Sequence, residues 1–170
     1  MRRTVRLAAG ILAAAAVVFV VASCNDDDTT GPANKTYVAN LNAAAEGSGH
    51  TSPGSGVVTF VDLGNEITWT MNLTNMTAVT QSHIHLGDAT ALAPPAGTGA
   101  GPVIINLFLP NGPTATLNGE VAHGSITNAN NAAVSLDSLR VLFNNGHAYA
   151  NVHTSANPGG EIRDQVHPTP

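Results

Sequence analysis

Residues 66–73 have the sequence Glu66-Ile67-Thr68-Trp69-Thr70-Met71-Asn72-Leu73, in which polar and apolar side chains alternate without a break. Successive side chains of a β-strand point to opposite faces, so this alternation separates the stretch into an apolar face and a polar face. The apolar face consists of Ile67, Trp69, Met71 and Leu73. We therefore expect a half-buried β-strand that turns these four side chains toward a hydrophobic core.

Short runs of the same kind, rich in β-branched and aromatic residues, recur from Lys35 onward between Gly, Pro and Asn residues. We expect strands at residues 36–41, 56–63, 66–73, 80–86, 102–107, 116–126, 147–153 and 161–166. About eight short strands separated by turn residues are typical of an all-β fold. The sequence thus predicts an antiparallel β-sandwich or a partly closed, Greek-key-like barrel.

One segment has helical rather than strand periodicity. Between residues 135 and 145, apolar side chains recur at a spacing of about 3.6 residues, and they are Leu136, Leu139, Leu142 and Phe143. Ser135 or Asp137 can cap the start of a helix, and Gly146 can end it. We expect one short helix here that covers an end or an edge of the sheets. A hairpin turn at Asn144-Asn145-Gly146 is the alternative.

The N-terminus has the organisation of a bacterial lipoprotein signal peptide. Three arginines within residues 1–6 are followed by an apolar run over residues 7–21 and by Val21-Ala22-Ser23-Cys24. The apolar run is shorter than the roughly 20 residues that a bilayer-spanning helix needs. Small residues before the only cysteine predict that residues 1–23 are removed and that Cys24 carries a lipid. An ordinary cleaved signal peptide and twin-arginine export are the alternatives.

Lipidation of Cys24 would hold the protein to a membrane of the bacterial cell envelope, in an extracytoplasmic position that faces the periplasm or the cell surface. Residues 24–34 are acidic and contain Gly31-Pro32, so we expect a flexible tether. Its three aspartates, residues 26–28, could instead bind calcium. By length, residues 35–167 form one domain, and residues 168–170 form a tail.

The charge of the chain excludes one class of partner. After residue 23 the chain keeps three basic residues against eleven acidic residues, which is a net charge of −8 with neutral histidines. No basic patch remains to neutralise phosphates, so we expect no binding to nucleic acid. The single cysteine also excludes an intramolecular disulfide, and the core must stabilise the domain alone.

Two histidines, His83 and His85, occur one residue apart in a predicted strand. Their side chains share a face, with Cα atoms about 6.6 Å apart, so both imidazoles can reach one ion. In the predicted strand 147–153, the small apolar side chains suit the core, which leaves Tyr149, Asn151 and His153 on the opposite face. If these strands are neighbours, His83, His85 and His153 form a cluster that suits Cu or Zn.

Two further candidates, Glu161 and Arg163, share the face opposite Ile162 and follow a Pro158-Gly159-Gly160 turn. Glu161 could be another metal ligand or accept a hydrogen bond from a histidine N–H, with Arg163 as its ion-pair partner. The histidines, Tyr149, Asn151, Glu161 and Arg163 could instead form a hydrogen-bonded network that only holds the sheet ends and a loop together. The sequence leaves both interpretations open.

Two groups of residues form recognisable motifs. One is Ser82-His83-Ile84-His85-Leu86-Gly87, and the other runs from Tyr149-Ala150-Asn151-Val152-His153-Thr154 through Pro158-Gly159-Gly160-Glu161-Ile162-Arg163. Both groups resemble the CHRD (chordin) domain family. The resemblance also includes residues 101–107 and 139–145. It implies an extracytoplasmic β-domain, because single CHRD domains occur in many bacterial exported proteins. Asp164 departs from the family, which usually has Gly at this position.

A shorter resemblance concerns the copper-binding strand of Cu,Zn superoxide dismutases. His83-Ile84-His85 followed by Gly87-Asp88-Ala89-Thr90 is similar to that strand, and Arg163 after a Gly-Gly pair is similar to the arginine near its copper. The cysteine pair that forms the disulfide of that family is missing here.

These observations favour a non-enzymatic binding or structural module of the cell envelope, with an unknown envelope or extracellular partner. The alternative is a Cu- or Zn-binding envelope protein that uses the histidine cluster. A hydrolase lacks support, because no Gly-x-Ser-x-Gly pattern is present and Ser82 would point away from His83. We therefore expect no catalytic residue.

Overall fold

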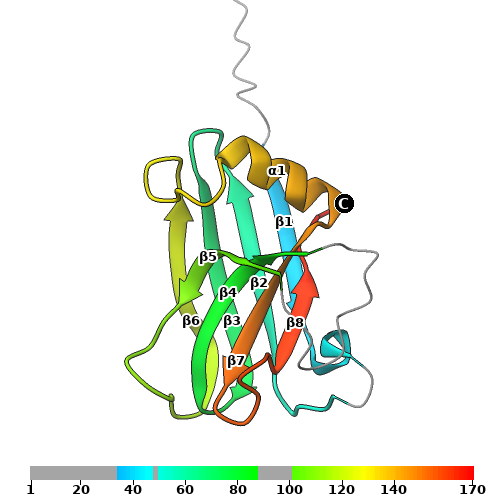
Figure 1. Cartoon of the computed structure of the whole chain (residues 1–170), viewed down its shortest axis with the longest axis vertical. Helices are drawn as coiled ribbons and strands as arrows, with labels where there is room; N and C mark the ends of the chain where they lie inside the picture. The colour runs from blue at the N-terminus through cyan, green and yellow to red at the C-terminus, as the bar shows by residue number, and fades with distance from the viewer. Residues whose placement is uncertain (1–33, 48–49, 88–100) are drawn as a thin grey trace, which may run out of the picture. The chain divides into compact units, whose positions relative to one another are not determined.

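The structure, a computed structural model, describes residues 34–47, 50–87 and 101–170. These residues form two antiparallel sheets that face each other (Figure 1). One sheet has the order β6-β3-β2-β1-β9, with β6 at Leu117–Ile126, β3 at Ile67–Met76, β2 at Ser55–Asp62, β1 at Lys35–Leu41 and β9 at His167–Pro168. The other has the order β5-β4-β7-β8, with β5 at Val103–Phe108, β4 at Val79–Leu86, β7 at Ala148–Thr154 and β8 at Ile162–Gln165. The predicted all-β sandwich is confirmed, and the described strands do not close into a barrel.

The alternating apolar side chains fill the space between the two sheets. On β3, the four residues predicted from the sequence are all buried: Ile67, Trp69, Met71 and Leu73. Neighbouring strands of this sheet contribute Tyr37, Ala39, Leu41, Val58 and Phe60, and the other sheet contributes Ile84, Ala150, Val152 and Ile162. Alternation within each strand therefore determines which face of each sheet meets the core.

The predicted helix is confirmed as α1 (Leu136–Asn145), which lies across one end of the sandwich (Figure 1). Ser135 is its N-cap, and its side chain accepts a hydrogen bond from a backbone N–H of the first turn. Gly146 ends the helix in the left-handed conformation, with φ of 66°, so residues 144–146 are not a hairpin turn. Phe143 packs against Tyr37 and Phe60 at centroid distances of 5.2 and 4.9 Å.

Two short elements are absent from the sequence-based prediction. A 3-10 helix, η1 (Ala43–Glu46), follows β1 and is capped by the side chain of Asn42. The strand β9 pairs with β1, so the sheet continues to Pro168, where a tail was expected. Elements of four and two residues are too short to show a periodic pattern.

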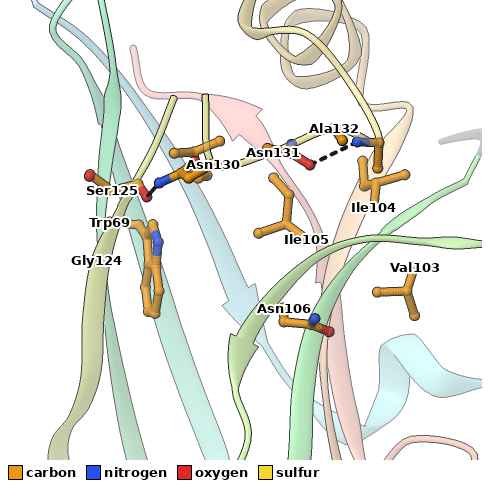
Figure 2. Close-up of a pocket in the computed structure, with 12 residues that line it drawn as sticks. Trp69, Val103, Ile104, Ile105, Asn106, Gly124, Ser125, Asn130, Asn131 and Ala132 are labelled. Carbon is orange, nitrogen blue, oxygen red and sulfur yellow. Dashed lines mark hydrogen bonds between the residues drawn. The ribbon is translucent and has the colours of Figure 1, made fainter. Parts of the chain in front are cut away.

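The two edges of the sandwich differ. At one edge, two backbone hydrogen bonds between Asn42 and Arg163 connect the end of β1 to β8. Their distances from the donor nitrogen to the acceptor oxygen are 3.1 and 3.2 Å. At the other edge, β5 and β6 have no further strand partner among the described residues. A pocket of about 470 Å³ lies between them, with Trp69 on one wall and Ile105 on the other (Figure 2).

The lining of this pocket is neutral, and two of its amide side chains, those of Asn130 and Asn131, have hydrogen-bond partners. Asn130 donates a hydrogen bond from Nδ2 to the carbonyl oxygen of Ser125, at 2.9 Å. Oδ1 of Asn131 accepts one from the backbone N–H of Ala133, at 3.2 Å (Figure 2). These hydrogen bonds stabilise the loop after β6, so the side chains of Asn130 and Asn131 do not mark a ligand site.

Several predictions fall outside the described residues. They concern the signal peptide, lipidation of Cys24, the tether up to residue 33, and the residues after Gly87 that resemble the superoxide dismutase strand. Within the described part of the chain, no helix has both the length and the apolar character needed to cross a bilayer.

Candidate metal centre

The two strands that carry the histidines are neighbours, as the cluster requires. β4 and β7 pair antiparallel in the middle of their sheet, with His83 opposite Asn151 and His85 opposite Tyr149. Directly opposed residues share a face of the sheet, and His153 lies two residues beyond Asn151 on that same face. This face points away from the core, to which Ile84 and the small side chains of β7 belong.

We call His83, His85 and His153 the histidine trio. Each of the three residues is about 95% buried, with exposures of 6%, 4% and 5%. One ring nitrogen from each lies within 4.8 Å of one from each of the others. Because bonds from zinc to imidazole nitrogen are about 2.0–2.1 Å long, small side-chain rotations would let one ion contact all three rings.

Two backbone carbonyls fix the orientation of two of these rings. Nδ1 of His85 lies 2.7 Å from the carbonyl oxygen of Gly101, and Nδ1 of His153 lies 2.9 Å from that of Pro158. A carbonyl oxygen can only accept a hydrogen bond, so each Nδ1 carries the proton and each Nε2 carries a lone pair. Hydrogen bonds of this kind orient most metal-binding histidines.

One nitrogen of each trio imidazole is buried without a hydrogen-bond partner. These atoms are Nδ1 of His83, Nε2 of His85 and Nε2 of His153. On the same face, the hydroxyl of Tyr149 and Oδ1 of Asn151 are also buried and make no hydrogen bond of ordinary geometry, although Gly101 and Arg163 lie near the hydroxyl and Asn151 lies near His85. Most buried polar atoms in native proteins are hydrogen-bonded, so this concentration calls for an explanation. A cation coordinated by all three of these nitrogens would give each of them a partner.

Burial keeps the trio in the neutral form. It lowers the pKa of His83 to about 4, with smaller contributions from His153 and His85. Burial also lowers the pKa of both His85 and His153, although their hydrogen bonds to backbone carbonyls oppose the shift. Neutral imidazole is the form that binds a metal, so the trio is ready to bind one at physiological pH.

A series of stacked and charged side chains adjoins the trio. The Tyr149 ring is parallel to the His85 ring, with centroids 5.0 Å apart. Cζ of Arg163 lies 4.7 Å from the centroid of the Tyr149 ring, and its Nε donates a hydrogen bond to the carbonyl of Ala45 at 2.8 Å. The same Nε lies 3.9 Å from Oε2 of the buried Glu46. Burial raises the pKa of Glu46 to about 7, although Arg163 opposes this shift.

Glu161 does not join the trio, which corrects the sequence-based expectation. Its carboxylate accepts hydrogen bonds from the side chains of Ser52, Thr154 and Asn157, at 2.6, 2.5 and 3.2 Å. Burial alone would raise the pKa of Glu161, but these hydrogen bonds lower it. The carboxylate thus belongs to a separate network that fixes the turn before β8.

Sequence reasoning did not find three of the groups around the trio. Glu46 pairs with Arg163, where Glu161 was expected, and its short element leaves no sequence pattern. Gly101 must lack a side chain, because a Cβ there would overlap with the backbone of the end of β4. Pro158 belongs to a turn that the sequence marks clearly, but the role of its carbonyl oxygen leaves no mark in the sequence.

A family model identifies the domain that contains this site. The family model of the CHRD domain matches residues 37–166, a range that contains the trio, Tyr149 and Arg163. Comparison with curated proteins gives no match. Since the matched range covers more than half of the chain, the protein belongs to the CHRD domain family.

Proposed function

We propose that this CHRD domain binds a copper or zinc ion through the histidine trio. The observation that carries the proposal is that three buried imidazoles, each with an unpaired nitrogen, converge on one place. Backbone carbonyls hold His85 and His153 in the tautomer that leaves Nε2 free. Imidazole nitrogen is a ligand that both copper and zinc accept in proteins.

A purely structural network explains the neighbours of the trio but not the trio itself. Glu161 and Arg163 make hydrogen bonds to side chains and to a backbone carbonyl, as such a network requires. The trio leaves one nitrogen of each ring unpaired. Each such atom costs about 1–3 kcal/mol when nothing is bound, and coordination of an ion would remove this cost.

We further propose that the protein is exported and anchored by a lipid on Cys24, as a non-enzymatic module of the bacterial cell envelope. The basic segment, the apolar run and the small residues before Cys24 support this location. On such a module, the trio would hold its ion for storage or for redox chemistry, and the exposed loops and strand faces would be available to an envelope or extracellular partner.

Metal binding is tested by elemental analysis of the purified protein after loading with Cu or Zn and extensive dialysis. We expect the wild type to retain about one ion per chain and the His83→Ala/His85→Ala variant to retain none, with circular dichroism showing that the variant is folded. His123→Ala, which removes an exposed histidine on β6, should retain metal like the wild type. No retention by the wild type, or equal retention by the double variant, would overturn the proposal.

Export and lipidation are tested with the full chain in a bacterial host grown with labelled palmitate. We expect label in the wild type and none in a Cys24→Ser variant, and we expect an inhibitor of signal peptidase II to accumulate the uncleaved precursor. A wild-type chain without label would overturn the lipid anchor while leaving the metal site intact.

A further inference from the structure

We propose that the ion held by the histidine trio is Cu(I), and that the neighbouring Arg163 disfavours divalent ions at this site. The inference rests on the proposed metal-binding function and adds the charge and identity of the ion. It follows from the number of ligands, from their charge, and from the charged side chains around them.

The number of ligands favours Cu(I). Among the described residues, the trio is joined by no further His, Cys, Asp or Glu ligand atom. Zn(II) in proteins almost always has four ligands, and a water is one of them where the protein supplies three imidazoles. Cu(II) prefers a tetragonal arrangement. Each of these ions would need an additional donor, in a site whose three residues are almost completely buried. Cu(I) is a closed-shell monocation that three nitrogen ligands can satisfy in a trigonal arrangement.

The charge of the site favours the same ion. The three imidazoles are neutral ligands, and the carboxylate of Glu161, which could have supplied a negative charge, is held in its own network. The guanidinium of Arg163 carries a positive charge. It lies against the Tyr149 ring, which is itself stacked on His85. Because electrostatic repulsion scales with the charge of the ion, Arg163 destabilises a dication twice as strongly as a monocation.

The carboxylate of Glu46 limits the repulsion between Arg163 and the ion. Substitutions of these two residues should therefore change the preference for Cu(I) in opposite directions. Its Oε2 lies 3.9 Å from Nε of Arg163, and its Oε1 is buried without a partner. At a pH above 7, where this carboxyl is ionised, loss of its charge should therefore strengthen the preference for Cu(I). Loss of the guanidinium charge should weaken that preference.

The test measures two affinities of the purified protein. Cu(I) affinity is measured without oxygen against the chelator bathocuproine disulfonate, and Zn(II) affinity against the chromophoric chelator 4-(2-pyridylazo)resorcinol. Wild type is compared with Arg163→Gln, with Glu46→Gln and with Arg163→Lys, which keeps the positive charge. We expect Cu(I) to displace Zn(II) from the wild type. The Cu(I) preference is the ratio of the Cu(I) affinity to the Zn(II) affinity. We expect Arg163→Gln to lower this ratio by about tenfold and Glu46→Gln to raise it. Arg163→Lys should change the ratio little.

The outcomes separate this inference from the proposal on which it rests. Zn(II) that binds as tightly as Cu(I) to the wild type would overturn the inference and leave the metal site standing. Binding of neither ion would overturn both. If neither Arg163→Gln nor Glu46→Gln changed the preference for Cu(I) over Zn(II), the claim that Arg163 disfavours divalent ions at this site would be overturned. The wild-type measurement decides the identity of the ion even if a variant does not fold.

Discussion

The imidazole of His85 and the phenol ring of Tyr149 lie parallel, with an interplanar angle of 5° and centroids 5.0 Å apart. Gly87 makes room for this stack, because a Cβ at residue 87 would lie 2.6 Å from Cε1 of Tyr149. The Tyr149 ring thus fixes the plane of the imidazole, and the Gly101 carbonyl fixes its tautomer. The orientation of this ligand is therefore set before any ion binds.

Substitutions of Tyr149 separate the role of its ring from that of its hydroxyl. Tyr149→Phe keeps the stack and removes an unpaired buried hydroxyl, so we expect unchanged metal affinity and a free energy of unfolding that is equal or higher by about 1 kcal/mol. Tyr149→Ala leaves a cavity beside His85 and should lower that free energy by about 3–5 kcal/mol. Urea unfolding and chelator competition measure both effects. Loss of metal in Tyr149→Phe would show that the hydroxyl, and not the stacked ring, supports the site.

A methyl group at residue 101 should disturb the site through the backbone. In Gly101→Ala the new Cβ would overlap with the carbonyl of Leu86, and the Gly101 carbonyl that holds His85 would have to move. We expect weaker metal binding and a loss of about 1–3 kcal/mol in the free energy of unfolding. Gly159→Ala is the matched control, because its Cβ would meet no atom within 4 Å. If Gly101→Ala retained metal like the control, the Gly101 carbonyl would not be needed to orient His85.

The sequence predicts local features of this site better than long-range ones. The shared face of His83 and His85 follows from the geometry of one strand, and the core face of β3 follows in the same way. Convergence of His153 depends on the pairing of β4 with β7, which the sequence could state only as a condition. The sequence left open whether Glu161 joins the histidines or a hydrogen-bonded network, because one of its partners, Ser52, lies more than a hundred residues away in the sequence.

His83 should make the metal-free protein less stable in acid. Its pKa is about 4 in the folded protein and 6.5 as the ordinary value, so in this pH range the unfolded chain binds the proton and the folded chain does not. The contribution of His83 to the free energy of unfolding is therefore complete above pH 6.5 and decreases as the pH falls toward 4, by about 3 kcal/mol. Urea unfolding with a chelator present, for wild type and His83→Gln, measures it. Identical pH profiles would contradict a buried, neutral His83.

Glu46 should produce the opposite dependence on pH. Burial raises its pKa from 4.5 to about 7, so the folded protein binds the proton more tightly than the unfolded chain. Its contribution to stability is complete below pH 4.5 and decreases as the pH rises toward 7. A Glu46→Gln variant does not lose this stability as the pH rises. Its free energy of unfolding, relative to that of the wild type, should therefore increase between pH 4.5 and 7. If the difference in free energy of unfolding between the variant and the wild type stayed constant over this range, the pKa of the Glu46 carboxyl would not be raised in the folded protein.

The most direct test of the metal centre is anomalous diffraction from crystals of the copper-loaded protein. We expect one anomalous peak about 2.0–2.1 Å from Nδ1 of His83, Nε2 of His85 and Nε2 of His153. The absence of a peak in copper-loaded crystals, or a peak at any other group of side chains, would contradict the claim that these three histidines form a metal centre.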